Sequence, residues 1–244
     1  MIVFVHGVPE TAALWDKVRA HLDAESVALS LPGFGTPRPD GFGATKDEYV
    51  DWLLAELDGI DGPIDLVGHD WGAALTYRVA TAHGERLHSW VTDNLNGIRP
   101  DYEWHDFARI WQTSGEGEQF WADTLALPLE EQAAIFEVVG VPHDDALTLA
   151  GWADETMSGC VLDLYRSAVP NNFATWNEPF RPTSAPGLVL LATEDPFGDV
   201  DGTREVAAAL GARVEVLGSF GHWWAFQAPA EAAAALTAFY ASID

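Results

Sequence analysis

The sequence predicts an α/β fold, a doubly wound and mostly parallel sheet that is interrupted once by a helical insertion. At both ends of the chain, short apolar runs alternate with helical patterns, as in repeated βα units. Between residues 99 and 182 no strand-like run is found, and tryptophan and acidic residues dominate. A length of 244 residues suits one domain carrying such an insertion. We therefore expect a core formed by residues 1–98 and 183–244, and a helical cap, or lid, formed by residues 99–182.

The predicted strands are short apolar runs that end at glycine, proline or polar residues. They cover residues 2–5, 27–31, 64–67, 87–92, 188–192 and 213–217. The predicted core helices repeat apolar residues at helical spacing, over residues 10–22, 47–57, 73–82, 204–210 and 230–240. Because the two kinds of segment alternate, a parallel sheet covered by helices is expected.

Within the insertion, residues 106–111, 129–138 and 146–165 are predicted to be helical. Five tryptophans belong to this region, more aromatic surface than a solvated linker carries: Trp104, Trp111, Trp121, Trp152 and Trp176. We expect most of them to fill a small core of the cap, and one or two to line a pocket.

Charge is the unusual feature of the composition. The chain has 38 acidic and 12 basic residues, a formal net charge of −26. Such a surface repels phosphate backbones and anionic lipids, so nucleic acid and membrane partners are not expected. The charge indicates solubility or salt tolerance, because no local cluster supports steering of a cationic substrate.

The compartment follows from cysteine usage and hydropathy. Cys160 is the single cysteine, so no disulfide can form within the chain. No apolar run reaches the roughly 20 residues needed to cross a bilayer, and the first residues, MIVFVHG, do not resemble a secretory signal. We expect a cytoplasmic protein, with no cofactor and no metal centre, and make no prediction of its oligomeric state.

The strongest chemical signal is DLVGHDWGAA, residues 65–74. An apolar strand leads into Gly68-x-Asp70-x-Gly72 and then directly into an alanine-rich helix, the pattern of a nucleophile elbow. The turn is so sharp that side chains at the two glycines would collide with neighbouring backbone. The elbow would hold the Asp70 carboxylate at a helix N-terminus, where the dipole favours its ionised form. The alternative is an ordinary strand-to-helix turn with Asp70 as its cap.

Two further motifs favour catalysis over that alternative. FVHGVPE, residues 4–10, follows the first strand, where a loop can direct a backbone N–H into the site. We expect the N–H groups of Val8 and Trp71 to form an oxyanion hole. GSFGHWWAFQAP, residues 218–229, places His222 on a glycine-flanked loop after the last strand, as suits a general base.

The acid that orients His222 has several candidates. LLATEDPFGD, residues 190–199, follows the penultimate strand, and an acid there keeps the order nucleophile, acid, histidine. Asp195 is preferred because it is close to the strand end and precedes a proline turn. Glu194 and Asp199 are neighbouring alternatives, and Asp93 follows an earlier strand.

Together these motifs resemble the α/β-hydrolase superfamily, in particular its epoxide hydrolase and haloalkane dehalogenase branch. HGVPE resembles the His-Gly-x-Pro motif, GHDWG the elbow and GHW the histidine loop. The resemblance covers nearly the whole chain and implies an α/β-hydrolase fold that starts at the third strand, so that the sheet is shortened at its N-terminus. It also implies that Asp70 forms an alkyl-enzyme ester, which a water activated by His222 and Asp195 hydrolyses.

The group that accepts the leaving atom separates the two branches. Dehalogenases of this kind bind halide between the tryptophan after the nucleophile, here Trp71, and an asparagine whose place Val8 takes. A cap tryptophan, Trp104 or Trp111, could substitute. Epoxide hydrolases use cap tyrosines as proton donors. The segment LDLYRSAVPNNFATW supplies Tyr165, whereas Phe107 occupies the place of the second tyrosine.

A few aromatic residues near these donors are expected to lie at or line the pocket, namely Trp104, Phe107, Trp111 and Trp223. Tyr102 is a possible replacement for the second tyrosine. The favoured function is opening of a small apolar epoxide to a diol. The alternatives are dehalogenation of a haloalkane or haloacid, hydrolysis of an ester or lactone, and non-catalytic ligand binding.

Overall fold

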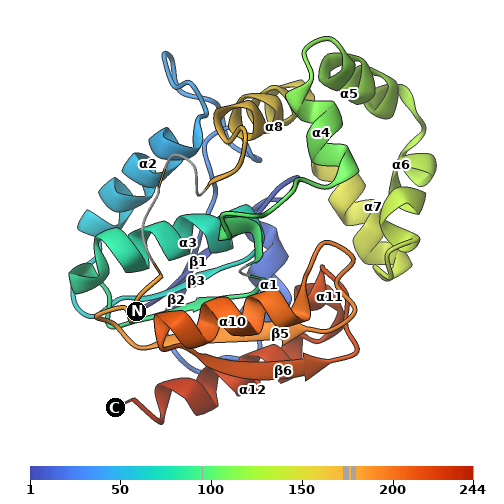
Figure 1. Cartoon of the computed structure of the whole chain (residues 1–244). Coiled ribbons are helices and arrows are strands. Elements are labelled where there is room, and N and C mark those ends of the chain that lie inside the picture. The colour runs from blue at the N-terminus through green and yellow to red at the C-terminus, as the bar shows by residue number, and fades with distance from the viewer. Residues whose placement is uncertain (95, 173–175, 177–179, 244) are drawn as a thin grey trace.

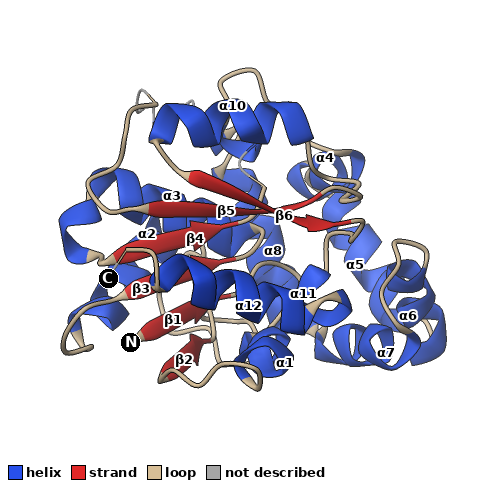
Figure 2. Cartoon of the chain, turned by 90° about the horizontal axis from the view of Figure 1, so that it is seen from below, coloured by secondary structure: helices blue, strands red, loops and turns tan. Residues whose placement is uncertain are grey.

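The computed structural model describes residues 1–94, 96–172, 176 and 180–243. Six parallel strands form one sheet in the order β2-β1-β3-β4-β5-β6 (Figure 2). The strands are β1 (Ile2–Val5), β2 (Ser26–Leu29), β3 (Asp65–Gly68), β4 (Ser89–Thr92), β5 (Gly187–Ala192) and β6 (Arg213–Gly218). Each strand occupies one of the predicted apolar runs, which confirms the predicted parallel α/β architecture.

Burial along the strands explains why the central runs are apolar without alternation. All residues of β1, β4 and β5 are buried, because helices cover both faces of the sheet. The edge strands β2 and β6 are half-buried or mostly exposed. In the register, Val5 of β1 pairs with Leu29 of β2 and Gly68 of β3, so the carboxyl ends of these strands lie together. Ligands of open α/β sheets bind beyond this edge.

Helices of the core pack on the two faces of the sheet. On one face lie α2 (Lys46–Asp58), α3 (Trp71–Ala82) and α10 (Val200–Leu210). On the other lie α1 (Asp16–Arg19), α11 (Trp224–Gln227) and α12 (Pro229–Tyr240). Each layer has its own apolar cluster, one around Leu66 and Leu75 and the other around Phe4 and Leu236. Short 3₁₀ turns cover Ala12–Trp15, Gly84–Arg86 and Asn96–Ile98.

The prediction of one helix over residues 10–22 is wrong. Only Asp16–Arg19 is α-helical, after the 3₁₀ turn. Glu10 turns its carboxylate inward, where it accepts the Gly7 N–H at 2.8 Å. Thr11 caps the 3₁₀ turn by accepting the Ala13 N–H. Both side chains therefore serve the loop after β1, and the helical pattern starts later than the sequence indicates.

Within the described ranges, five α-helices between β4 and β5 form a group beyond the carboxyl edge of the sheet (Figure 1). They are α4 (Asp106–Gln112), α5 (Glu116–Ala126), α6 (Leu129–Glu137), α7 (His143–Trp152) and α8 (Glu155–Ser167). The single helix predicted over 146–165 is wrong, because Ala153 is extended and Asp154 caps a new helix by accepting the Met157 N–H at 2.7 Å. The sequence also missed α5.

No helix among the described residues is long and apolar enough to span a membrane.

Trp176 anchors the end of the inserted segment to the core, because its indole N–H donates to Asp47 at 2.8 Å and its ring lies under the Lys46 ammonium. Residues 173–175 of the segment that carries Tyr165 lie outside the described residues.

Candidate active site

Asp70 stands at the elbow between β3 and α3 in a strained backbone conformation, with φ 51° and ψ −117°. Glycine is required on both sides. A Cβ on Gly68 would lie 2.1 Å from the Gly72 carbonyl oxygen, and a Cβ on Gly72 would lie 2.2 Å from the Val5 oxygen. The turn therefore closes only with glycines, and it holds the Asp70 carboxylate at the N-terminus of a 12-residue helix.

The two carboxylate oxygens of Asp70 face different groups. Oδ1 accepts the Val8 N–H at 2.9 Å, and Oδ2 lies 3.9 Å from His222 Nε2. Of the two predicted oxyanion donors, only Val8 donates to the carboxylate within the described part of the chain, while Trp71 begins α3 beside it. Burial raises the pKa of Asp70 to about 6, against the opposing effect of His222 and His69. The carboxylate is therefore ionised at neutral pH.

His222 is oriented by Asp195. Its Nδ1 lies 2.9 Å from Asp195 Oδ2, and both side chains are buried. Asp195 is held in turn by the Phe197 N–H, which donates to Oδ1 at 2.8 Å, and by the Asn94 amide, which donates to Oδ2. Burial alone would lower the pKa of His222, but Asp195 outweighs it and the pKa is raised. In Asp195 the same pairing outweighs burial and lowers the pKa.

The other candidate acids do not meet His222. Glu194 and Asp199 are exposed, and Asp199 caps α10 by accepting the Gly202 N–H at 3.0 Å. Asp93 is buried, but it accepts the Trp224 indole N–H at 3.0 Å and pairs with His69 Nδ1. Among the four carboxylates, Asp195 is thus the one that the structure brings to His222.

A second buried layer lies behind Asp70 and was missed by the sequence reasoning. His69 is enclosed by two carboxylates, with Nδ1 on Asp93 and Nε2 3.1 Å from Glu10 Oε1. These partners raise the pKa of His69 well above 6.5 although burial opposes it. Asp93 Oδ1 also accepts the Asp70 N–H at 3.3 Å, which ties this layer to the elbow. The only sequence signal was that Glu10 belongs to the FVHGVPE motif and His69 to the DLVGHDWGAA motif.

Glu10, His69 and His222 offer ligand atoms within 4.8 Å of one another, the one such group in the described ranges. Both ring nitrogens of His69 already face carboxylates. His222 Nδ1 likewise faces Asp195. The ion pairs thus account for the arrangement without a metal.

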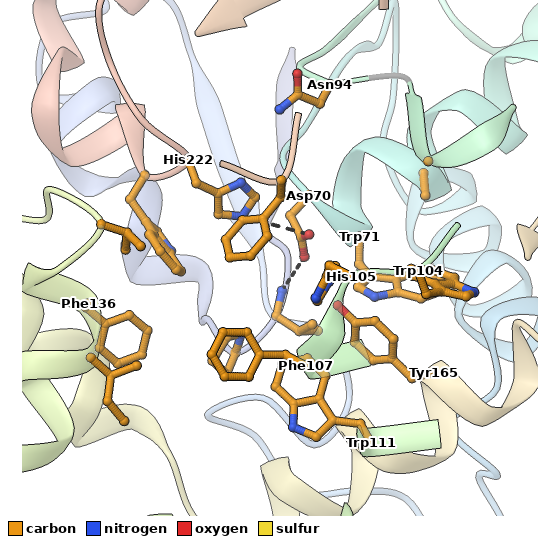
Figure 3. A pocket seen from close by; sticks show the side chains of 18 of the residues that line it. Asp70, Trp71, Asn94, Trp104, His105, Phe107, Trp111, Phe136, Tyr165 and His222 are labelled. Atoms are coloured by element: carbon orange, nitrogen blue, oxygen red, sulfur yellow. Dashed lines mark hydrogen bonds and ion pairs between the residues drawn. The ribbon is translucent and has the colours of Figure 1, made fainter. Parts of the chain in front are cut away.

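A cavity of about 480 Å³ opens in front of Asp70 and His222, between the sheet edge and the inserted helices (Figure 3). Its walls are mostly apolar and rich in aromatic side chains, and its described lining includes no lysine or arginine. All four pocket residues expected from the sequence line it: Trp104, Phe107, Trp111 and Trp223. Trp121 lines it as well, so three cap tryptophans face the pocket where one or two were expected. Further lining residues were missed, among them His105, Phe120, Phe136 and Phe197.

Tyr165 of α8 projects into this pocket beside Trp71, with the ring centroids 5.3 Å apart. Burial raises the pKa of its hydroxyl well above 10, and hydrogen bonding with the Trp71 side chain offsets part of the rise. The hydroxyl is therefore protonated throughout the physiological range. Tyr102 lines the same cavity, and burial raises its pKa to about 12. Phe107, which occupies the place expected for the second tyrosine, is 39 % exposed.

The two cap tryptophans considered as halide donors differ in their surroundings. The Trp104 indole N–H donates to the Ala168 carbonyl at 3.4 Å, so it is directed to the backbone of the cap. Trp111 is buried and packs against Tyr165, with ring centroids 4.9 Å apart. Its indole N–H has no hydrogen-bond partner within the described ranges.

A comparison with protein families places this site in context. The model of the alpha/beta hydrolase family matches residues 2–236. The chain belongs to this family. The six-stranded parallel sheet agrees with the α/β-hydrolase fold that the sequence predicted.

Curated relatives of this α/β-hydrolase include both expected branches. A haloalkane dehalogenase of Mycolicibacterium smegmatis is 35% identical over 43% of the chain and 36% of its own length. One of Mesorhizobium japonicum is 26% identical over 69% of the chain and 52% of its own length. The matches thus span only about a third to a half of these relatives. An epoxide hydrolase of Caballeronia sordidicola is 22% identical over 100% of the chain and 88% of its own length.

Solved structures give the same fold. Haloalkane dehalogenase DbeA from Bradyrhizobium elkani USDA94 superposes with a TM-score of 0.78 at 20% identity, covering 99% of the chain and 90% of that structure. Epoxide hydrolase VrEH1 from Vigna radiata superposes with a TM-score of 0.79 at 18% identity, with the same coverage. At these identities the likeness establishes the fold and leaves the reaction open.

Proposed function

We propose that this α/β-hydrolase opens an epoxide to a diol through an alkyl-enzyme ester on Asp70. The observation that carries the proposal is the placement of an aspartate, not a serine, at the elbow, with Val8 N–H on one oxygen and His222 3.9 Å from the other. A carboxylate in this position can attack a saturated carbon and form an ester. An elbow serine instead attacks the carbonyl carbon of its substrate, and an epoxide has no carbonyl group.

In the first step, an Asp70 oxygen forms a bond to an epoxide carbon, and the carbon–oxygen bond of the epoxide breaks. The electron pair stays on the departing oxygen, which takes the proton of the Tyr165 hydroxyl. An unassisted alkoxide is a poor leaving group at neutral pH, so a phenol in the pocket lowers this barrier. The Tyr165 hydroxyl, whose pKa burial raises, is protonated before the transfer.

In the second step, water attacks the carbonyl carbon of the Asp70 ester. His222 Nε2 takes a proton from the water and passes it to the departing alcohol oxygen, while Asp195 stabilises the imidazolium. Charge develops on the Asp70 oxygen that faces Val8 N–H. The remaining carboxylic acid proton returns to the Tyr165 phenolate, which regenerates the enzyme.

We assign the substrate to small, uncharged, apolar molecules. The walls of the 480 Å³ cavity are mostly apolar, and no lysine or arginine among its described lining residues could pair with a substrate carboxylate. This composition argues against haloacids. We further propose that residues 99–182 act as the cap that closes this pocket, since Trp104, Trp111 and Tyr165 all enter it from the inserted segment.

The second candidate is a haloalkane dehalogenase with the same three catalytic groups. Trp71, directly after the nucleophile, and the two dehalogenase relatives favour it. Against it stands Val8 in the place of the halide-binding asparagine, together with the Trp104 N–H, which donates to Ala168. Ester or lactone hydrolysis and non-catalytic binding have no specific observation in their favour.

A single turnover in heavy-oxygen water tests the proposal. Styrene oxide and 1-bromohexane are each mixed with excess enzyme, and the peptide that holds Asp70 is analysed by mass spectrometry. Attack of water on the ester carbonyl should place the label in Asp70 first, and Asp70→Asn should give no adduct. Label found only in the product would refute the mechanism, and bromide release without any diol would establish the dehalogenase. Absence of every adduct and product would favour a binding protein.

A further inference from the structure

His105 is a polar side chain in the aromatic pocket for which the reaction above has no use. It precedes α4, and its Nδ1 accepts the Ala108 N–H at 3.2 Å, so that it caps the helix. A ring nitrogen that accepts a hydrogen bond carries no hydrogen, so the neutral imidazole has its hydrogen on Nε2. Capping thereby fixes the tautomer, and no described residue accepts from Nε2.

The imidazole is surrounded by residues of the catalytic pocket. Its ring centroid lies 5.0 Å from that of Phe197 and 6.2 Å from that of Tyr165. Phe197 in turn lies 5.1 Å from the His222 ring. Figure 3 shows His105 on the side of the pocket where Asp70, Trp71 and Tyr165 also point.

The environment keeps the ring neutral. Burial, together with the nearby His222, lowers the pKa of His105 to about 4. At pH 6 to 8 the side chain is therefore an N–H donor that keeps its proton, and it cannot replace Tyr165 as an acid. A neutral donor of this kind stabilises a developing negative charge by a hydrogen bond.

We propose that His105 is a catalytic residue that donates its Nε2–H to the leaving oxygen, beside the Tyr165 hydroxyl. The inference rests on the proposed alkyl-enzyme mechanism. When Asp70 attacks, the electron pair of the broken carbon–oxygen bond stays on the oxygen; Tyr165 transfers its proton there, and His105 holds the same oxygen without losing its own. The pocket then has two donors although Phe107 stands where a second tyrosine was expected.

Two substitutions separate this role from helix capping. His105→Asn places an amide oxygen near the position of Nδ1, so this variant should keep the cap but lose the donor into the pocket. His105→Gln should do the reverse, because its longer amide reaches the position of Nε2 while the Ala108 N–H loses its acceptor. A merely structural role predicts that glutamine is the more harmful of the two.

The experiment measures thermal unfolding and the single-turnover rate of ester formation with styrene oxide for both variants and the wild type. We expect His105→Asn to unfold near the wild-type temperature and to form the ester about 10²- to 10³-fold more slowly, as after loss of one oxyanion donor. His105→Gln should unfold earlier but form the ester within about tenfold of the wild-type rate. Hydrolysis of the ester, which depends on His222, should stay within about threefold in both.

Wild-type ester formation by His105→Asn, or an equal loss in both variants, would overturn the role of His105 and leave the Asp70 mechanism standing. Absence of any Asp70 ester in the wild type would instead overturn the proposed function, and the role of His105 with it.

Discussion

Replacing Asp70 with asparagine should stabilise the protein at neutral pH, although it removes the proposed nucleophile. The fold buries this carboxylate and raises its pKa from 3.8 to about 6. Between these two values the folded chain holds a proton that the unfolded chain releases. Raising the pH therefore destabilises the wild type relative to Asp70→Asn, whose amide oxygen can still accept the Val8 N–H.

The magnitude follows from the shift. A change from 3.8 to about 6 corresponds to at most about 3 kcal/mol, at about 1.4 kcal/mol per pH unit. Because 21% of the side chain is exposed to the pocket, solvent reduces this, and we expect about 1–3 kcal/mol above pH 7. For a chain of this size, that corresponds to a rise of roughly 2–12 °C in unfolding temperature.

The assay is urea unfolding of both proteins from pH 5 to pH 8, which stays above the isoelectric point near 4.3. Roughly half of the stability difference should develop within this interval. Asp195→Asn is the matched control with the opposite sign, because the pKa of Asp195 is lowered by its pairing with His222. Loss of one partner from such a buried pair should destabilise the fold by about 3–5 kcal/mol. An Asp70→Asn protein no more stable than the wild type at pH 8, or a difference that does not grow from pH 5 to 8, would refute the reasoning.

Three further predictions concern the reaction. Tyr165→Phe should slow ester formation from styrene oxide by roughly 10²- to 10⁴-fold and leave any turnover of 1-bromohexane nearly unchanged, as rapid-mixing measurements of both substrates would reveal. His222→Gln should form the Asp70 ester but not hydrolyse it, so intact mass spectrometry should find an accumulating adduct, and its absence in a folded variant would contradict the role of His222. Ester formation should fall as the pH drops below about 6, because protonation removes the Asp70 nucleophile; a rate that is flat down to pH 5 would be inconsistent with this assignment.

Local pattern was sufficient for most of the fold. The apolar runs located all six strands, because parallel strands covered on both faces need continuous apolar sequence. The apolar periodicity gave wrong helix boundaries where a polar side chain forms a hydrogen bond that interrupts the helix. Asp154 ends one helix and caps the next within a run that looks continuous, and Glu10 turns inward to Gly7 within a run that looks helical. Such choices depend on capping and burial, which periodicity does not encode.

The candidate site was predictable to the extent that its geometry is local. Gly68 and Gly72 mark the elbow because both contact backbone within a few residues of Asp70 or across the adjacent strand. His105 carried no comparable mark. Its position in the pocket results from packing of α4 against α8 and the loop of Phe197, segments distant in sequence. A histidine that caps a helix cannot be distinguished by sequence from one that also faces a cavity.

The two buried histidines near Asp70 differ in what each ring nitrogen meets, and this difference decides which of them can act as a base. His69 has a carboxylate at both nitrogens, Asp93 and Glu10, so its proton is held on both sides and its pKa is raised well above the ordinary value. His222 is hydrogen-bonded to a carboxylate only at Nδ1, where Asp195 lies at 2.9 Å, while its Nε2 faces the Asp70 carboxylate at 3.9 Å, beyond hydrogen-bond distance. The rings lie 4.7 Å apart, so a protonated His69 opposes protonation of His222 and limits the rise in its pKa that Asp195 causes. Asp93, which binds His69, also holds the elbow through the Asp70 N–H. In the proposed mechanism, the charge on His69 favours the neutral form of His222, which is the form that accepts a proton from water.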